Sequence, residues 1–314
     1  MTQALHKKKA LFHHMNHKIS NLWANLSESL FSQIDDKFID NFRQPGGVNS
    51  RLAAWDPFDP TMRYYKLILF NAAMRWTDDA YLLYRKLGNT NVGNPVTVRS
   101  KGLDINLDYL FTINEYMFLK SNMNIQSINS IIEIGAGFGR TCHALLKLLP
   151  NLTSYTIIDL PELLNLSAGV LARVVPDHMQ KISFINATVE TDWQNISADL
   201  VINIDSFQEM LPETIKQYFD NVINRSSNFY INNPIGKYLP ESVGITNPNK
   251  IDIMDVFQLG YCRNVIDIFD ETQLNRARDN FVQSYMPGSE WQAVAQSPME
   301  IVPYYHNVLY TRKS

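Results

Sequence analysis

Apolar positions in the first part of the chain recur with helical spacing. Between Asp59 and Gly88 they return every three or four residues, which predicts a single helix with Asp59 as N-cap and Pro60 in its first turn. Residues 1–57 show a mixed helical pattern, and 106–120 predict another helix. Residues 1–125 are therefore expected to form a helical N-terminal region.

From Ser127 onward, short apolar runs alternate with helical patterns, as in repeated strand-helix-strand units around a parallel sheet. The expected strands are 130–134, 154–159, 182–186, 200–205 and 228–232, and the helices between them are 139–149, 161–174 and 212–224. A helix over 271–285 and a strand pair, 291–295 with 307–311, are expected to close the chain. The predicted fold class is α/β, a Rossmann-like catalytic domain over 126–314 with an insertion at about 234–290.

Charge and composition narrow the function to small-molecule chemistry. The chain has 31 acidic and 28 basic residues, whereas a protein that binds nucleic acid through phosphates needs a basic surface. The two cysteines, Cys142 and Cys262, form neither a disulfide framework nor a zinc motif. There is no signal-peptide pattern and no apolar run long enough to cross a membrane, so the expected location is cytoplasmic, with no membrane or nucleic-acid partner.

The most informative segment is I-I-E-I-G-A-G-F-G-R over 131–140, where a strand runs into glycines at alternate positions. Such glycines allow a ligand to approach the backbone closely. A dinucleotide fingerprint needs glycine at position 140, where this chain has Arg140, which disfavours a nicotinamide-dependent oxidoreductase. The pattern E-x-G-x-G-x-G resembles the first motif of class I S-adenosylmethionine (SAM) dependent methyltransferases. This resemblance implies a mostly parallel sheet with an antiparallel last strand.

The resemblance also implies roles for individual residues. Glu133 would support the loop and the methionine moiety of SAM, and Arg140 would either contact the cofactor carboxylate or be a solvated helix residue. Asp159 ends the second strand and would accept hydrogen bonds from the ribose hydroxyls, or cap the following helix instead. Polar residues after the third strand would hydrogen-bond the exocyclic amine of the adenine, or else form an ordinary turn. The expected cofactor-binding residues are Glu133, Gly135, Ala136, Gly137, Gly139, Arg140, Asp159, Leu160, Ala187, Thr188, Asn203, Asp205 and Ser206.

The candidates for catalysis follow the fourth strand, in N-I-D-S-F-Q-E-M over 203–210. Ligands of open α/β sheets bind beyond the carboxyl ends of the strands, so Asp205 or Glu209 could take a proton from an acceptor hydroxyl. Alternatively, Asp205 orders the loop and Glu209 begins a helix. His306 is the third catalytic candidate, whereas His143 is expected to pack or to be exposed. Asp205 and Glu209 could also hold a divalent metal, although no dedicated metal motif is present.

Five runs together are similar to a bacterial family of sugar O-methyltransferases, over about residues 104–312. They are N-E-Y-M-F at 114–118, I-E-I-G-A-G-F-G-R at 132–140, I-D-L-P-E-L at 158–163, N-I-D-S-F-Q-E-M at 203–210 and F-Y-I-N-N at 229–233. The resemblance implies methyl transfer from SAM, giving S-adenosylhomocysteine, to a hydroxyl of a sugar, sugar nucleotide or glycosylated small molecule.

Other interpretations of the same motifs remain open. The acceptor could be a non-sugar metabolite methylated on oxygen or nitrogen, or the chain could be an inactive SAM-binding partner protein. Aromatic side chains could stack on an acceptor or belong to the core. They are Tyr64, Tyr65, Trp76, Tyr238, Tyr261 and Tyr285. The N-terminal arm is a candidate dimerisation element, so a homodimer is one expected assembly.

Overall fold

The computed structural model describes residues 62–244 and 257–313. The described residues from Tyr65 onward belong to one compact unit. The predicted N-terminal arm, with its dimerisation role, and the helix start at Asp59 and Pro60 lie outside the described residues.

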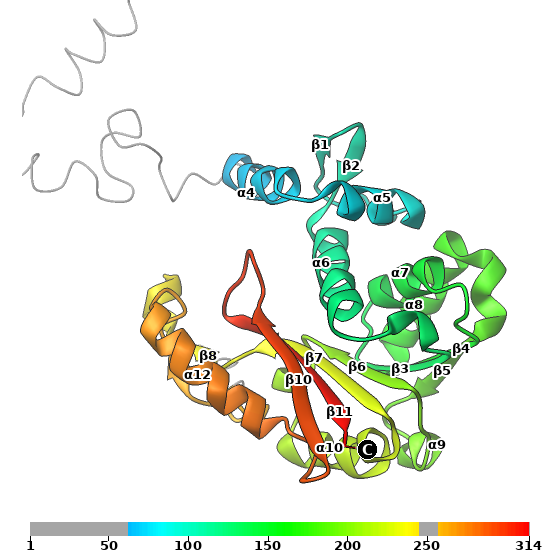
Figure 1. Ribbon diagram of the computed structural model, residues 1–314, viewed down its shortest axis with the longest axis vertical. Coiled ribbons are helices and arrows are strands. Elements are labelled where there is room, and N and C mark those ends of the chain that lie inside the picture. The colour runs from blue at the N-terminus through cyan, green and yellow to red at the C-terminus, as the bar shows by residue number, and fades with distance from the viewer. Residues whose placement is uncertain (1–61, 245–256, 314) are drawn as a thin grey trace, which may run out of the picture. The chain divides into compact units, whose positions relative to one another are not determined.

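Seven strands form the central sheet in the order β10-β11-β7-β6-β3-β4-β5 (Figure 1). They are β3 (Ser130–Ile134), β4 (Ser154–Asp159), β5 (Ile182–Asn186), β6 (Leu200–Ile204), β7 (Asn228–Pro234), β10 (Trp291–Pro298) and β11 (Tyr305–Arg312). The strands β5, β4, β3, β6 and β7 are mutually parallel, and β11 lies antiparallel between β7 and β10. The predicted Rossmann-like, mostly parallel sheet with an antiparallel last strand is confirmed.

The direction of the connections reverses at the neighbouring strands β3 and β6, and in open α/β sheets such a switch point has a crevice outside the carboxyl ends of the two strands. The chain runs from β3 outward through β4 and β5, then returns to the other side of β3 and continues through β6 and β7. The helices that follow β3 and β6 therefore lead to opposite sides of this point, at the carboxyl edge of the sheet, which is where ligands bind in open α/β folds.

Helices cover both faces of the sheet. The buried residues of α5 (Asp78–Leu87), α6 (Leu107–Asn122), α7 (Arg140–Leu148) and α8 (Pro161–Val174) share one apolar core with one face. Those of α10 (Pro212–Asn221) and α12 (Glu271–Ser284) share a second core with the other face. The inner strands β3, β6 and β7 are buried on both sides, which explains why their sequences are continuous apolar runs rather than alternating patterns.

Smaller elements complete the described chain. They are α4 (Arg63–Met74), α9 (Glu190–Trp193), the hairpin β1 (Val98–Ser100) with β2 (Leu103–Ile105), the parallel pair β8 (Lys237–Tyr238) with β9 (Val265–Ile266), and the 3-10 turns η1 (Ile125–Ser127), η2 (Pro176–Lys181), η3 (Phe207–Glu209), η4 (Ile223–Arg225) and η5 (Pro240–Val243).

The single helix predicted from Asp59 to Gly88 is wrong in its middle. The structure has two helices there, because Thr77 caps the second one: its hydroxyl accepts a hydrogen bond from the Ala80 amide at 3.3 Å. Asp78 and Asp79 follow in the first turn, where negative charge is favourable. The β1–β2 hairpin was not predicted, since its strands of three residues are too short to show an alternating pattern.

Candidate active site

A cavity of about 470 Å³ lies at the carboxyl edge of the sheet, beside the crevice between β3 and β6. Its lining begins at the glycine loop after β3, passes the ends of β4 and β5, and reaches the loop after β6. Eight of the predicted cofactor residues line it, together with Glu209: Gly135, Gly137, Asp159, Leu160, Ala187, Thr188, Asp205 and Ser206. An adjoining cavity of about 210 Å³ is lined by Glu133, Ala136 and Arg140, and shares Gly135, Gly137 and Asp205 with the first.

The glycine loop needs its glycines for two different reasons. Gly135 has φ +77°, and a Cβ there would lie 2.3 Å from the Ser206 Oγ, so the loops after β3 and β6 could not meet. Gly137 has φ +57°, and a Cβ there would have no atom within 4 Å because it would enter open space. Gly139 lines neither cavity: it precedes α7 with φ +88° and lies against Leu171 of α8, which is a packing role.

Asp159 joins the glycine loop to the second strand. Its Oδ2 accepts a hydrogen bond from the Gly137 amide at 2.9 Å, and its Oδ1 accepts one from the Leu160 amide at 2.8 Å, just before α8. The side chain is buried, and this burial raises the pKa of its carboxyl. Each carboxylate oxygen can accept more than one hydrogen bond, so Asp159 holds the loop and keeps acceptor capacity for a ligand in the cavity.

Asn203 is buried beneath the site. Its Nδ2 donates to the Ile134 carbonyl at 2.9 Å and to the Ser206 Oγ at 2.6 Å. Its Oδ1 accepts from the Phe207 amide at 3.2 Å and from the Asn233 Nδ2 at 2.8 Å. Asn203 lines neither cavity, so its amide fixes the two loops and the end of β7 against one another instead of facing a ligand.

Gln208 anchors the same loop to the segment that follows β7. Its Nε2 donates to the carbonyls of Pro234 at 2.8 Å and Cys262 at 3.0 Å, while the Lys237 Nζ donates to the Gln208 carbonyl at 2.7 Å. Gly260 leaves room for the Gln208 side chain, because a Cβ at that glycine would overlap the amide oxygen. The loop that carries Asp205 and Glu209 is therefore held by buried amides on both sides.

Asp205 and Glu209 both line the larger cavity, yet their surroundings differ. The Asp205 Oδ1 accepts a hydrogen bond from the Tyr305 hydroxyl at 2.6 Å. Glu209 has no side-chain hydrogen bond or ion pair within the described part of the chain. Both residues are exposed overall, and the partial loss of solvent around each carboxyl is the largest cause that raises its pKa; the nearby Asp205 charge raises that of Glu209 further. A carboxylate with a raised pKa and no partner can accept a proton.

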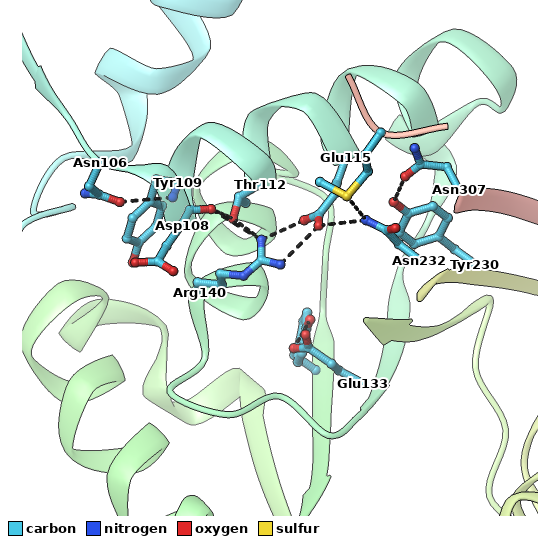
Figure 2. Close-up of polar contacts among 12 residues, drawn as sticks. Asn106, Asp108, Tyr109, Thr112, Glu115, Glu133, Arg140, Tyr230, Asn232 and Asn307 are labelled. Atoms are coloured by element: carbon cyan, nitrogen blue, oxygen red, sulfur yellow. Dashed lines mark hydrogen bonds and ion pairs between the residues drawn. The ribbon is translucent and has the colours of Figure 1, made fainter. Parts of the chain in front are cut away.

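Arg140 points toward α6 rather than into solvent (Figure 2). Its guanidinium donates to Glu115 at 2.7 and 3.0 Å and to the Thr112 hydroxyl at 2.6 Å. The two side chains are only 16% and 4% exposed, which makes the pair a buried one. The Asn232 Nδ2 donates to the Glu115 Oε1 at 3.2 Å and extends this network to β7. The interpretation of Arg140 as a solvated helix residue is wrong, because the Glu115 carboxylate draws it inward.

Glu133 is buried on β3, and its Oε2 accepts a hydrogen bond from the Tyr155 hydroxyl at 2.7 Å. Burial raises the pKa of this carboxyl to about 7. Glu133 therefore lies at one wall of the smaller cavity, with its carboxylate bonded to Tyr155 of β4.

Neither His306 nor His143 lines the larger cavity. His306 is 2% exposed, its Nε2 lies 2.9 Å from the Gln296 Oε1, and its ring packs against Phe281 of α12. Strand alternation explains this: the residue before it, Tyr305, faces the opposite side and reaches Asp205. His143 is buried between the Tyr109 hydroxyl at 2.6 Å and the Leu87 carbonyl at 3.2 Å, which agrees with the packing interpretation.

The site contains two residues that sequence reasoning did not single out, Tyr305 and Glu115. Tyr305 is the neighbour of the chosen candidate His306, and the pairing of β11 with β7 alone decides which of the two faces the cavity. Glu115 lies within the run N-E-Y-M-F at 114–118. An acidic residue among the apolar positions of a helix could have indicated a buried charge there. Of the aromatic residues that could stack on an acceptor, Trp76 and Tyr285 are buried in the core, whereas Tyr65 and Tyr238 are exposed.

Within residues 62–244 and 257–313, no group of three or more histidine, cysteine, aspartate or glutamate side chains is arranged to hold a metal ion. None of the helices in those ranges is both long and apolar enough for a membrane span.

The sequence matches no family model and no curated protein. Among solved structures, the mitomycin 7-O-methyltransferase MmcR is similar over 74% of this chain and 67% of its own, with 11% identity and a TM-score of 0.43. The glycopeptide N-methyltransferase MtfA, complexed with SAM, is similar over 76% and 98%, with 14% identity and a TM-score of 0.41. The Podospora anserina methyltransferase PaMTH1, bound to S-adenosylhomocysteine, is similar over 82% and 98%, with 12% identity and a TM-score of 0.42. The function of this chain has to be inferred from its own residues.

Proposed function

We propose that this protein is a SAM-dependent O-methyltransferase that acts on a hydroxyl of a sugar or glycosylated small molecule. The observation that carries the proposal is the continuity of one cavity. The cavity extends from Gly137, which has open space where a Cβ would be, past the buried Asp159. It ends at two carboxylates, those of Asp205 and Glu209. A nucleoside cofactor needs the first two features, and proton removal from an alcohol needs the third.

The residues present fit SAM as the cofactor. Open space at Gly137 would admit a ligand against the backbone, and Asp159 keeps acceptor capacity for ribose hydroxyls. Glu133 and Arg140 line the adjoining cavity, where the methionine end of the cofactor would be held. When bound, SAM would supply a methyl group on a positively charged sulfur. The cavity volume of about 470 Å³ is within the range typical of small-molecule sites.

The protein's own contribution to the reaction is proton removal and orientation. An alcohol has to lose its proton as the oxygen attacks a methyl carbon, and in this proposal Glu209 accepts that proton. Its carboxylate lines the cavity and has no competing hydrogen-bond donor within the described residues. Asn203 and Gln208 hold the Glu209 loop from below, so the base keeps its position during the reaction.

A polyhydroxylated acceptor is favoured by a further cavity of about 240 Å³, lined by α6 and by the adjoining ends of β10 and β11, and connected to the smaller cofactor cavity through the Glu115–Arg140 ion pair. Its lining combines oxygen-bearing side chains with apolar ones: Asn114, Glu115, Met117, Phe118, Ser297, Pro298, Met299, Glu300 and Asn307. Carboxylate and amide oxygens accept hydrogen bonds from hydroxyl groups, and the apolar side chains can pack against a ring face. Glu115 contributes both to this cavity and to the ion pair with Arg140.

The first test is calorimetric titration of the purified protein with SAM, S-adenosylhomocysteine and NAD. Saturable binding of the first two alone is expected. Gly137→Val should weaken SAM binding at least about 100-fold, because it strains a backbone with φ +57° and fills the open space. Gly169→Ala is the matched control: this glycine lies in α8 without a positive φ and with no atom within 4 Å of an added Cβ, so affinity should be unchanged.

Retained affinity in Gly137→Val would remove the glycine loop from the proposal. With SAM binding established, a screen of sugar nucleotides beside non-sugar alcohols and amines identifies the acceptor. Methylation of amines or non-sugar alcohols alone would contradict the sugar assignment and leave the methyltransferase assignment intact.

A further inference from the structure

Tyr305 stands at the start of β11, where the antiparallel strand meets the carboxyl edge of the parallel sheet. It pairs with Pro234 at the end of β7, while the Asp205 amide donates to the Asn232 carbonyl at 2.9 Å two residues earlier on β7. These two pairings bring together residues that are 100 positions apart in the chain. The Tyr305 hydroxyl donates to the Asp205 Oδ1 at 2.6 Å, which is a short distance for a bond to a carboxylate.

Asp205 has an unusual backbone conformation. Its φ of +55° lies in the left-handed region, which residues other than glycine seldom adopt. Aspartate tolerates this region better than most residues, and such strain persists only where surrounding contacts impose it. The amide bond to β7 and the side-chain bond to Tyr305 are the contacts that hold Asp205 in this conformation.

The charged groups that face the two carboxylates come from several elements. Arg140 of α7 and Tyr305 of β11 favour the ionised form of Asp205, whereas Glu115 of α6 opposes it. Lys237 of β8 favours ionisation of Glu209, whereas the charge on Asp205 opposes it.

Tyr305 itself remains protonated. Burial and the neighbouring Asp205 charge raise its pKa well above the ordinary value for tyrosine, so its hydroxyl stays a donor. The pair of carboxylates is thus asymmetric, since one has a dedicated donor and the other has none.

We propose that Tyr305 is a positioning residue that assigns different tasks to the two carboxylates. Its hydroxyl keeps Asp205 ionised and fixed, and the ionised Asp205 makes Glu209 the stronger proton acceptor. This assignment rests on the proposed methyl transfer, in which Glu209 takes the proton of the acceptor hydroxyl. Two carboxyl groups in one cavity whose surroundings separate their proton affinities have separate roles in acid-base chemistry.

The test is a titration of the carboxyl carbons by NMR in protein labelled with ¹³C at aspartate and glutamate side chains. Asp205→Asn and Glu209→Gln assign the two signals. In Tyr305→Phe, the Asp205 midpoint should rise by about one pH unit, because its ionised form loses a hydrogen bond. The Glu209 midpoint should fall, because Asp205 is then ionised in a smaller fraction of the molecules and repels the Glu209 charge less. In Asp205→Asn, the Glu209 midpoint should fall in the same way.

Tyr310→Phe is the matched control. It removes a tyrosine hydroxyl from the same strand, but that hydroxyl donates to the Val282 carbonyl at 2.8 Å on the other face of the sheet. Both midpoints should match the wild type in this variant. An unchanged Asp205 midpoint in Tyr305→Phe would overturn the proposal, as would a fall of both midpoints, which indicates a loosened and more hydrated cavity. The titration needs no cofactor, so failure of SAM to bind would refute the proposed function separately.

Discussion

Two pairs of charged side chains lie at the same edge of the sheet and differ in their partners. Arg140 and Glu115 form a buried, two-point ion pair in which each charge is matched by the other. Asp205 and Glu209 are two like charges in an open cavity, and a tyrosine hydroxyl donates to Asp205 alone. The first pair is satisfied and stabilises the junction between α6 and α7. The second pair keeps unsatisfied acceptor capacity, which is what proton transfer requires.

The largest expected effect tests the buried pair. Glu115→Gln leaves the Arg140 cation without its countercharge, and removing one partner of a buried pair commonly costs several kcal/mol. We expect a loss of about 3 kcal/mol in the free energy of unfolding, measured by urea denaturation at neutral pH. Asp220→Asn, which breaks the exposed pair with Lys216, is the control and should cost under about 0.5 kcal/mol. Equal, small losses in both variants would show that the Arg140–Glu115 pair contributes little to the fold.

The second prediction concerns the open pair. Glu209→Gln keeps the shape of the side chain and removes its capacity to accept a proton. Turnover should fall about 100-fold, while the SAM dissociation constant from calorimetry stays within about twofold of the wild type. Glu213→Gln, a substitution in the first turn of α10 that lies outside the cavity lining, is the control and should leave both values unchanged. Wild-type turnover in Glu209→Gln would move the proton-accepting role to Asp205.

The smallest expected effect comes from Glu133, which is buried like Glu115 but does not bond a cation. Its folded-state pKa is raised from 4.5 to about 7, so the folded protein binds this proton more tightly than the unfolded chain does. The stabilisation is present at low pH and is lost as the pH rises from about 4.5 to about 7. Between pH 5 and 7 the wild type should lose about 2 kcal/mol of stability relative to Glu133→Gln.

Urea denaturation of both proteins at several pH values measures this difference. Groups that titrate in both proteins cancel in the comparison, including His143, whose pKa is lowered to about 4 by burial. A difference in stability that stays constant from pH 5 to 7 would contradict the raised pKa of Glu133.

The sequence determined most of the parallel sheet, because fully buried strands and amphipathic helices leave strong local patterns. The strand predicted over 130–134 matches β3, and the helix predicted over 161–174 matches α8. The boundary that failed lies at Thr77, where a single capping residue interrupts an otherwise continuous helical spacing.

The glycine-loop half of the candidate site could also be predicted, since the glycine loop and Asp159 each follow directly from the strand that positions them. Gly137 and Asp159 are 22 residues apart, yet consecutive parallel strands place them within one hydrogen bond of each other. The order of the elements along the chain is enough to predict that contact.

The other half depends on contacts between distant segments. Tyr305 meets Asp205, and Glu115 meets Arg140, only after β11 has inserted beside β7 and α6 has packed against α7. No local pattern records which of Tyr305 and His306 faces the cavity, because a one-residue change of register would exchange them. The sequence by itself determined the parallel sheet and the position of the glycine loop, because local periodicity marks each strand and helix. Only the tertiary structure decided which charges are paired and which remain open, because that depends on side chains brought together from different layers.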